Sequence, residues 1–390
     1  MWRWRGIGAA AILVVVGTAT AGFGRGRPAA EPASSPAVAY LVMDADTGAV
    51  LAEHDAHKRW PPASMTKMMT VLLAMERVRD GSHRLDEPVR ASAWASRIGG
   101  SQVFLREGEV FTLGQLLEAV MINSANDGAV AVAEHIGGSS DAFVTLMNER
   151  AQSLGLHDTT YETPHGLPPS AGQKPDLSSA YDLAILGREL MRFPEVRQWA
   201  GTPKASFRDG TLEMMNTNHL VRDYPGCTGL KTGYYREAGF SVTASATRND
   251  FNVLAVVLGV ERKKDCFDEA ARLMNQAFAA YRVVAPAKRG APVGDVAVSG
   301  GSESGVKAIA TDDLRVLVKR GEDKGVVVES RIPRILEAPV HRDQAIGEIV
   351  VRRNDEELGR VPVIADRDVA ATGWFGWLWN RGMTTASAAH

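Results

Sequence analysis

The chain has 390 residues, which exceeds the usual size of one domain, so its length predicts two domains. Lysine and arginine number 44 against 46 aspartates and glutamates, for a formal net charge of -2. This balance gives no sign of the basic face that nucleic-acid binding needs, and we expect no nucleic-acid partner.

The first 36 residues are expected to lie outside the fold. Residues 1–5 carry positive charge, residues 6–21 are largely apolar, and small residues follow at 19–21. This pattern is typical of an export signal, although retention as an uncleaved anchor stays open. A mobile leader rich in alanine, proline and serine is predicted to reach residue 36.

The first chemical motif is Ser64-Met65-Thr66-Lys67. Residues 38–44 and 50–54 predict a β-hairpin, after which Pro61 and Pro62 favour the start of a helix at Ser64. Positions i and i+3 share a helix face, so Ser64 and Lys67 can touch. A serine hydroxyl needs an adjacent base to act as a nucleophile, and a buried lysine beside other cations can supply one.

The second motif, Ser124-Ala125-Asn126, is predicted to link two helices. A capping-box pattern at residues 112–115 opens a helix that stops at Asn123, and an apolar helix is expected over 129–136. A further helix should start at Ser139 or Asp141 and end at Gly155, and another should cover 179–193.

The third motif, Lys231-Thr232-Gly233, precedes two strongly β-forming runs at 239–246 and 251–260. We expect it to end an edge strand of an antiparallel sheet. A helix is predicted over 265–281. Strands near both ends with helices between them indicate an α/β (α+β) layered domain.

The chain changes character after residue 283. Short alternating runs at 306–311, 314–319, 325–330, 345–351 and 358–364 predict a small all-β domain over 284–367. Residues 368–390 contain three tryptophans and a phenylalanine within 374–379, followed by Arg381. Such aromatics beside a basic residue favour a membrane-associating tail, with a cap on the β domain as the alternative.

Each motif alone has an ordinary interpretation: a helix start with a solvated lysine, a helix cap at Asn126, or a turn at the end of a strand. Together and in this order, they form the signature of penicillin-binding proteins and serine β-lactamases. Over residues 37–281 the chain resembles the low-molecular-mass penicillin-binding proteins, the serine-type D-alanyl-D-alanine carboxypeptidases (peptidase S11-like). The supporting stretches are residues 123–127, 163–167, 179–184, 216–218, 229–234 and 238–240.

The resemblance implies a β-lactamase/transpeptidase-like catalytic domain over 37–283, with an antiparallel sheet flanked by helices, plus the small C-terminal all-β domain. It also implies the catalytic roles. Ser64 would be the acylated nucleophile, Lys67 its general base, and Ser124 the relay of a proton to the leaving D-alanine.

The same resemblance implies the substrate-binding residues. Asn126 would bind the substrate amide, while Lys231 and Thr232 would hold the terminal carboxylate beside Gly233. The oxyanion hole would be formed by the backbone amides of Ser64 and Tyr234.

As a member of this family, the protein would remove the terminal D-alanine from peptidoglycan stem pentapeptides and be acylated by β-lactam antibiotics. It would act at the periplasmic face of the bacterial inner membrane, without a metal or organic cofactor. A β-lactamase, and a non-catalytic cell-wall binding protein of the same fold, are the alternatives. An endopeptidase or transpeptidase would be a variant of the first function.

The sequence departs from the family pattern at Thr228, where aspartate is common, and at Tyr235, where threonine is frequent. An arginine near the substrate carboxylate aligns with Cys266. The missing charge could come from a neighbouring cation: Arg262, Lys263 or Lys264.

This alignment places Cys227 and Cys266 near the site, and we predict a disulfide between them, with two separate thiols as the alternative. His165 is expected to be structural and His219 has no assigned task. No zinc-peptidase motif is present in the sequence.

Overall fold

The computed structural model describes residues 35–322 and 324–372, so the predicted export signal and the aromatic residues at 374–379 lie outside the described residues. The chain divides into two compact units, with the change at Ala279 and Ala280. Within the described residues, no helix is both long and apolar enough to pass through a membrane.

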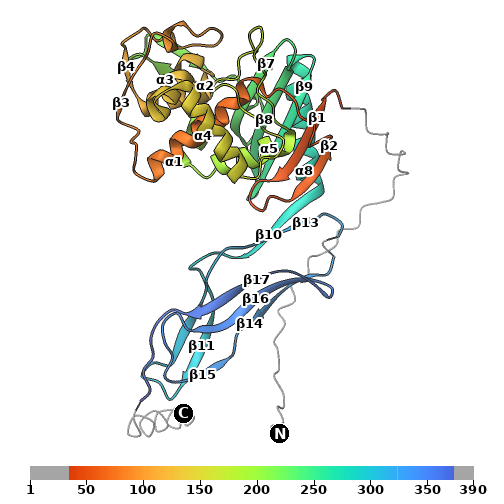
Figure 1. Cartoon of the computed structure of the whole chain (residues 1–390). Helices are drawn as coiled ribbons and strands as arrows, with labels where there is room; N and C mark the ends of the chain where they lie inside the picture. Colours follow the sequence, from red (N-terminus) through yellow and green to blue (C-terminus); the bar gives the residue numbers. More distant parts are fainter. Residues whose placement is uncertain (1–34, 323, 373–390) are drawn as a thin grey trace, which may run out of the picture. The chain divides into compact units, whose positions relative to one another are not determined.

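The first unit contains a five-stranded antiparallel sheet in the order β2-β1-β9-β8-β7 (Figure 1). Its strands are β1 (Ala39–Asp44), β2 (Val50–His54), β7 (Cys227–Tyr235), β8 (Gly239–Arg248) and β9 (Phe251–Val260). The predicted hairpin and the two long strands are confirmed. Every residue of β9 from Val253 to Leu258 is buried, because both faces of the sheet are covered.

Helices pack on the two faces of this sheet. They are α1 (Lys67–Arg79), α2 (Leu113–Ile122), α3 (Asn126–Gly137), α4 (Ser140–Ser153), α5 (Ala180–Leu190), α6 (Pro194–Ala200), α7 (Leu220–Asp223) and α8 (Lys263–Ala280). One large core joins α1–α6 to the face that carries Leu254 and Leu258. On the other face, Phe278 of α8 packs edge-on against Phe251, with ring centroids 5.5 Å apart.

Shorter elements complete the unit: η1 (Ala63–Thr66), β3 (Pro88–Arg90), η2 (Ala95–Arg97), β4 (Val110–Thr112), β5 (Lys204–Phe207) and β6 (Leu212–Met215).

Local sequence explains where the helices of this core begin. Thr112 and Gln115 form both hydrogen bonds of the predicted capping box, and α2 ends with Asn123 as its C-cap. The next helix begins at Asn126, three residues earlier than expected, so the link between α2 and α3 is short. Ser139 caps α4 by accepting a hydrogen bond from the amide of Ala142.

The second unit is all β, as predicted (Figure 1). Its strands are β10 (Tyr281–Ala287), β11 (Pro292–Ser299), β12 (Gly305–Ala310), β13 (Leu314–Lys319), β14 (Val326–Arg331), β15 (Ile335–Glu337), β16 (Ala345–Arg353) and β17 (Glu356–Ala365). They form a six-stranded sheet, β14-β16-β17-β12-β11-β15, and the pair β10-β13. Val369 belongs to the core of this unit and pairs with Val340.

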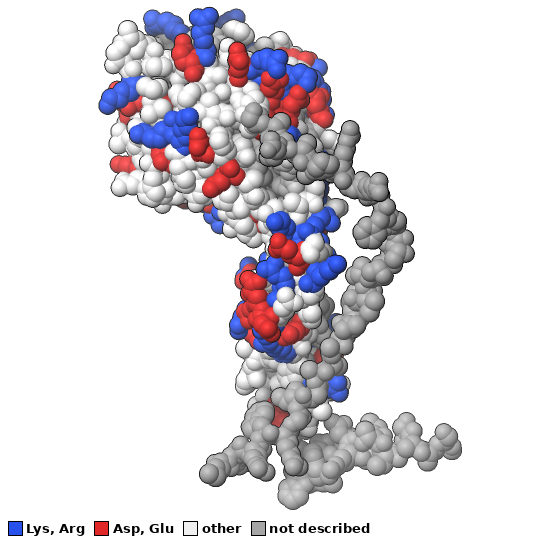
Figure 2. All heavy atoms as spheres, turned by 90° about the vertical axis from the view of Figure 1, so that its right-hand side faces the viewer, with Lys and Arg blue, Asp and Glu red and all other residues white. Residues whose placement is uncertain are grey.

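Charged side chains of both signs are interspersed on the face shown in Figure 2. In the second unit, for example, Glu348 pairs with Arg331 at 3.0 Å and with Arg360 at 3.3 Å. Exposed pairs of this kind contribute little to stability and mainly keep the surface polar.

Candidate active site

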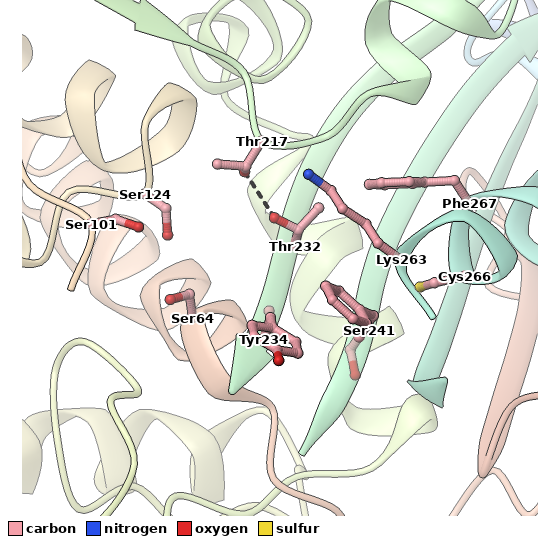
Figure 3. Close-up of a pocket in the computed structure, with 12 residues that line it drawn as sticks. Ser64, Ser101, Ser124, Thr217, Thr232, Tyr234, Ser241, Lys263, Cys266 and Phe267 are labelled. Carbon is pink, nitrogen blue, oxygen red and sulfur yellow. Dashed lines mark hydrogen bonds between the residues drawn. The ribbon is translucent and has the colours of Figure 1, made fainter. Parts of the chain in front are cut away.

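A pocket in the first unit brings residues of all three motifs together (Figure 3). Ser64 comes from η1 and Ser124 from the link between α2 and α3. Strand β7, at the edge of the sheet, contributes Thr232, Gly233 and Tyr234. The other lining residues are Ser101, Thr217, Phe240, Ser241, Lys263, Cys266 and Phe267.

Ser64 and Lys67 make the contact that their spacing predicts. The Nζ atom of Lys67 lies 3.0 Å from Oγ of Ser64 and donates a hydrogen bond to the carbonyl of His165 at 2.5 Å. The Lys67 side chain is fully buried at the start of α1. The amine is therefore fixed against the hydroxyl that it would deprotonate.

The two motif lysines lose their ordinary basicity in this environment. Burial lowers the pKa of Lys67 well below its usual value, and the charge of Lys231 lowers it further, against the opposing effect of Asp176 and Asp127. Burial also lowers the pKa of Lys231, to about 7. Burial and the neighbouring positive charge thus both favour the neutral amine that a general base at Lys67 requires.

Ser124 lines the pocket, and Asn126, two residues later, is the first residue of α3 and does not line it. Ser124 has a positive φ of 61°, and its Oγ is buried with no hydrogen-bond partner within residues 35–322 and 324–372. The Nδ2 atom of Asn126 donates to the carbonyl of Gly99 at 2.6 Å, and its Oδ1 likewise has no partner in that part of the chain. A buried polar atom without a partner is costly, and a ligand bound in the pocket would satisfy the Ser124 hydroxyl.

Two glycines lie against the backbone of the turn that carries Ser64, closer than any residue with a side chain could. A Cβ on Gly166 would lie 2.0 Å from the carbonyl oxygen of Ala63, and one on Gly233 would lie 2.2 Å from that of Pro62. Ala63 itself has a positive φ of 49°. Neighbouring backbone therefore holds the nucleophile's turn in a conformation that alanine rarely adopts.

The buried carboxylate of Asp176 organises the loop that faces Lys67. It accepts hydrogen bonds from the amides of Glu162 and Thr163, and from the hydroxyls of Thr163 and Thr66. This loop presents the His165 carbonyl to Lys67. Sequence reasoning missed Asp176, because an isolated aspartate in a loop carries no local signature.

The far end of the pocket offers hydroxyls and one cation. Thr232 Oγ1 donates a hydrogen bond to Oγ1 of Thr217 at 2.8 Å. Figure 3 shows the amine of Lys263 pointing toward this pair of threonines. Hydroxyl donors with an ammonium are suited to a carboxylate ligand.

The three cations expected to replace the family arginine differ in where they point. Lys263 lines the pocket. Arg262 instead pairs with Asp265 at 2.6 Å, and Lys264 pairs with Asp268 at 2.5 Å, both with largely exposed side chains. Lys263 is thus the member of this trio that can meet a ligand.

Two histidines lie close to these lysines. The imidazole of His165 is buried, and burial together with Lys67 lowers its pKa to about 3, so the ring is neutral. Its Nδ1 accepts a hydrogen bond from the amide of Leu167, a structural contact of the predicted kind. His219, for which the sequence suggested no task, lies beside Lys263.

The predicted disulfide between Cys227 and Cys266 is wrong, because both residues are free thiols. Strand register explains this. Cys227 pairs with Ala246 at one end of β7, while Cys266 lines the pocket that includes Gly233 and Ser241, which pair with each other toward the other end. The positions of Cys227 and Gly233 lie about 20 Å apart along the strand, far beyond the roughly 7 Å that bridged Cα atoms tolerate.

Comparison with known families agrees with this geometry. The family model described as D-alanyl-D-alanine carboxypeptidase matches residues 27–262. The model described as penicillin-binding protein 5, C-terminal domain, matches residues 281–371.

Individual relatives extend the similarity over most of the chain. The D-alanyl-D-alanine carboxypeptidase DacF of Bacillus subtilis is 35% identical over 342 residues, covering 87% of each chain. The crystal structure of penicillin-binding protein 5 from Haemophilus influenzae is 29% identical, with a TM-score of 0.67, over 87% of this chain and 99% of that one. Penicillin-binding protein D2 from Listeria monocytogenes, solved in its ampicillin-bound form, is 28% identical, with a TM-score of 0.57, over 63% of this chain and 98% of that one.

Proposed function

The chain belongs to the family of serine-type D-alanyl-D-alanine carboxypeptidases with a penicillin-binding protein 5 C-terminal domain, and we propose that it removes the terminal D-alanine from peptidoglycan pentapeptides through an acyl-enzyme on Ser64. The observation that carries this assignment of residues is the 3.0 Å contact between the buried Lys67 Nζ and Oγ of Ser64, which lines the pocket.

Acylation begins with proton transfer from Ser64 to Lys67. The neutral amine of Lys67 takes the hydroxyl proton as Oγ attacks the carbonyl carbon of the penultimate D-alanine. The backbone amides of Ser64 and Tyr234 stabilise the oxyanion. As the C–N bond breaks, the departing D-alanine amine receives a proton through Ser124, whose hydroxyl lies in the pocket.

Deacylation repeats this chemistry with water as the nucleophile. Lys67 accepts a proton from the water, the tetrahedral intermediate collapses, and Ser64 leaves with a proton. The products are the shortened peptide and free enzyme. A penicillin would acylate Ser64 by the same first step.

Substrate recognition uses the charged and polar groups around the reacting serine. Asn126 binds the substrate amide. Lys231 and Thr232 hold the terminal carboxylate, and we add Lys263 to this group in place of the family arginine. Lys263 is favoured because its amine points toward Thr232 (Figure 3), and charge-assisted hydrogen bonds to a carboxylate are the strong ones.

The enzyme's location rests on segments outside the described residues. The predicted export signal and the aromatic tail support action at the periplasmic face of the bacterial inner membrane. Removing residues after Thr372 leaves the core residue Val369 in place. With the signal also removed, this shortened protein should leave the membrane fraction, and its retention there would contradict the anchor.

The catalytic assignment is tested with purified protein lacking the first 36 residues. D-alanine release from a diacetyl-L-Lys-D-Ala-D-Ala tripeptide and labelling by a fluorescent penicillin should both vanish in Ser64→Ala. The exposed Ser170 gives a matched control, Ser170→Ala, which should keep both. Labelling without D-alanine release would favour a binding role, and rapid turnover of the penicillin would favour a β-lactamase.

A further inference from the structure

A second group of chemically capable side chains lies outside the pocket. It consists of His83, Glu87 and His135, none of which lines the active site. The Nδ1 atom of His83 and the Nε2 atom of His135 each lie 2.6 Å from the same oxygen, Oε1 of Glu87. One ligand atom from each of the three residues falls within 4.8 Å of the others.

The fold brings this trio together from separate parts of the chain. His83 and Glu87 lie between α1 and β3, and His135 lies in the last turn of α3, which packs against β3. The Glu87 carboxylate is also fixed through its second oxygen, which accepts a hydrogen bond from the Arg84 amide at 2.9 Å. Loop and helix thus present two imidazoles to one oriented carboxylate.

The three side chains are partly buried, which suits an ion that exchanges with solvent. The side chains of His83, Glu87 and His135 are 22%, 22% and 27% exposed. An ion from solvent can therefore reach them, while their partial burial limits the motion of the ligand atoms.

We propose that His83, Glu87 and His135 form a binding site for a divalent transition-metal ion, with Zn²⁺ the best fit. Two imidazole nitrogens and a carboxylate oxygen are donors that Zn²⁺ accepts at about 2.0–2.2 Å, leaving a fourth position for water. The ion would replace the two hydrogen bonds to Glu87. Each imidazole would bind the ion through the ring nitrogen that now faces the Glu87 carboxylate.

Coordination requires a small expansion of the trio. Ligand atoms around a tetrahedral ion with bonds of about 2.0 Å lie about 3.3 Å apart, which is wider than the present 2.6 Å contacts. Side-chain rotation of the two histidines can supply this change.

The site would act on stability rather than on the reaction. His135 is nine residues after Asn126 in α3, or about 13 Å along the helix axis. An ion bound at the C-terminal end of α3 would cross-link this helix to the loop that precedes β3. Because binding favours the native state alone, the melting temperature should rise by about 5–10 °C when free Zn²⁺ reaches about 100 times its Kd.

The test uses the chelator-treated protein, titrated with ZnCl₂ by calorimetry and with CoCl₂ by visible absorption. One ion should bind per chain, with the absorption of four-coordinate Co²⁺ and a raised melting temperature. Glu87→Gln and the double variant His83→Gln/His135→Gln should each lose more affinity than the roughly 10–100-fold that loss of an outer-shell partner costs.

A matched control comes from a histidine–carboxylate pair that has no third ligand within the described part of the chain. His57 Nδ1 lies 2.9 Å from Oδ2 of Asp158, and His57→Gln should leave metal binding unchanged. Labelling by fluorescent penicillin reports that each variant is folded. Absence of binding in the parent protein, or equal binding in the folded double variant, would overturn the proposal.

Discussion

The Nε2 atom of His219 lies 3.2 Å from Nζ of Lys263, and this contact orients the cation at the carboxylate end of the pocket. Burial lowers the pKa of His219, and the charge of Lys263 lowers it further, which favours the neutral imidazole that accepts a hydrogen bond from the ammonium. The ring also stacks on Phe267, with centroids 5.2 Å apart. A residue without a role in the sequence thereby becomes a support for substrate recognition.

The first prediction concerns Lys263. Lys263→Met should lower kcat/KM for the D-Ala-D-Ala tripeptide by about 10-fold to 100-fold, because a charge-assisted hydrogen bond contributes roughly 1.5–3 kcal/mol. Steady-state kinetics of D-alanine release measure the effect. Lys264→Met, which removes a cation paired with Asp268 instead, is the control and should change little. Equal losses of kcat/KM in the two variants would mean that Lys263 contributes only overall positive charge and makes no specific contact with the substrate.

The second prediction concerns the pH dependence of acylation. Lys67 acts as a base when neutral, so the acylation rate should rise with pH as the lysine pair loses its proton. The charge of Lys231 lowers the pKa of Lys67. Lys231→Met should therefore shift the acid limb of the pH–rate profile for acylation to higher pH, whether or not the maximal rate also falls. Stopped-flow labelling with a fluorescent penicillin measures it, and an unmoved limb would show that the two amines are uncoupled.

The third prediction concerns stability. The pKa of Lys231 is lowered from 10.5 to about 7 by burial. Between these values the unfolded chain binds more protons at this lysine than the native protein does. The free energy of unfolding contributed by Lys231 should therefore rise with pH, by at most about 1.4 kcal/mol per unit. Measured by urea unfolding at two pH values within this window, the free energy of unfolding should rise less in Lys231→Met than in the parent protein.

The fourth prediction compares two glycines with similar backbones. Gly166 and Gly172 have φ of 75° and 86°, so alanine costs a similar backbone strain at both. A Cβ at Gly166 meets the Ala63 carbonyl, whereas at Gly172 it meets nothing within 4 Å. Gly166→Ala should slow acylation by about 100-fold through displacement of Ser64. Gly172→Ala should acylate normally, and equal rates in the two would contradict the role of the contact.

The fifth prediction concerns the loop carboxylate. Asp176→Asn keeps the shape of the side chain but replaces an acceptor oxygen by an amide, leaving buried donors unsatisfied. The free energy of unfolding should fall by about 3 kcal/mol, as measured by the urea midpoint at constant m-value. Asp268→Asn removes an exposed carboxylate and should stay within about 0.5 kcal/mol. A similar small change in both would mean that Asp176 is dispensable to the loop.

Much of the fold was predictable because its signals are local. The capping box at Thr112, the cap at Ser139 and the spacing of Ser64 and Lys67 act over a few residues. A local signal can also be incomplete. The helix predicted over 179–193 ends at Leu190, and Pro194 then starts α6 in the position where proline is favoured.

Other features depend on contacts between distant segments, and sequence patterns did not identify them. Arg262, Lys263 and Lys264 are adjacent cations, and only the direction each faces at the start of α8 decides which of them enters the pocket. The wrong disulfide prediction has the same origin. Cys227 is close to the Lys-Thr-Gly motif in the sequence, but this closeness does not show how far along β7 it lies from the pocket.

The positive φ values of Ala63 and Ser124 have a consequence for how this enzyme can change. Backbone held in this region costs on the order of 1–3 kcal/mol per residue, and both residues adjoin or supply reactive groups. The unfavourable backbone conformations of Ala63 and Ser124 therefore lower the stability of the folded protein at positions that its reaction uses. Substitutions that relax these turns would raise thermal tolerance while loosening the reactive groups, so improvement of one property here opposes the other.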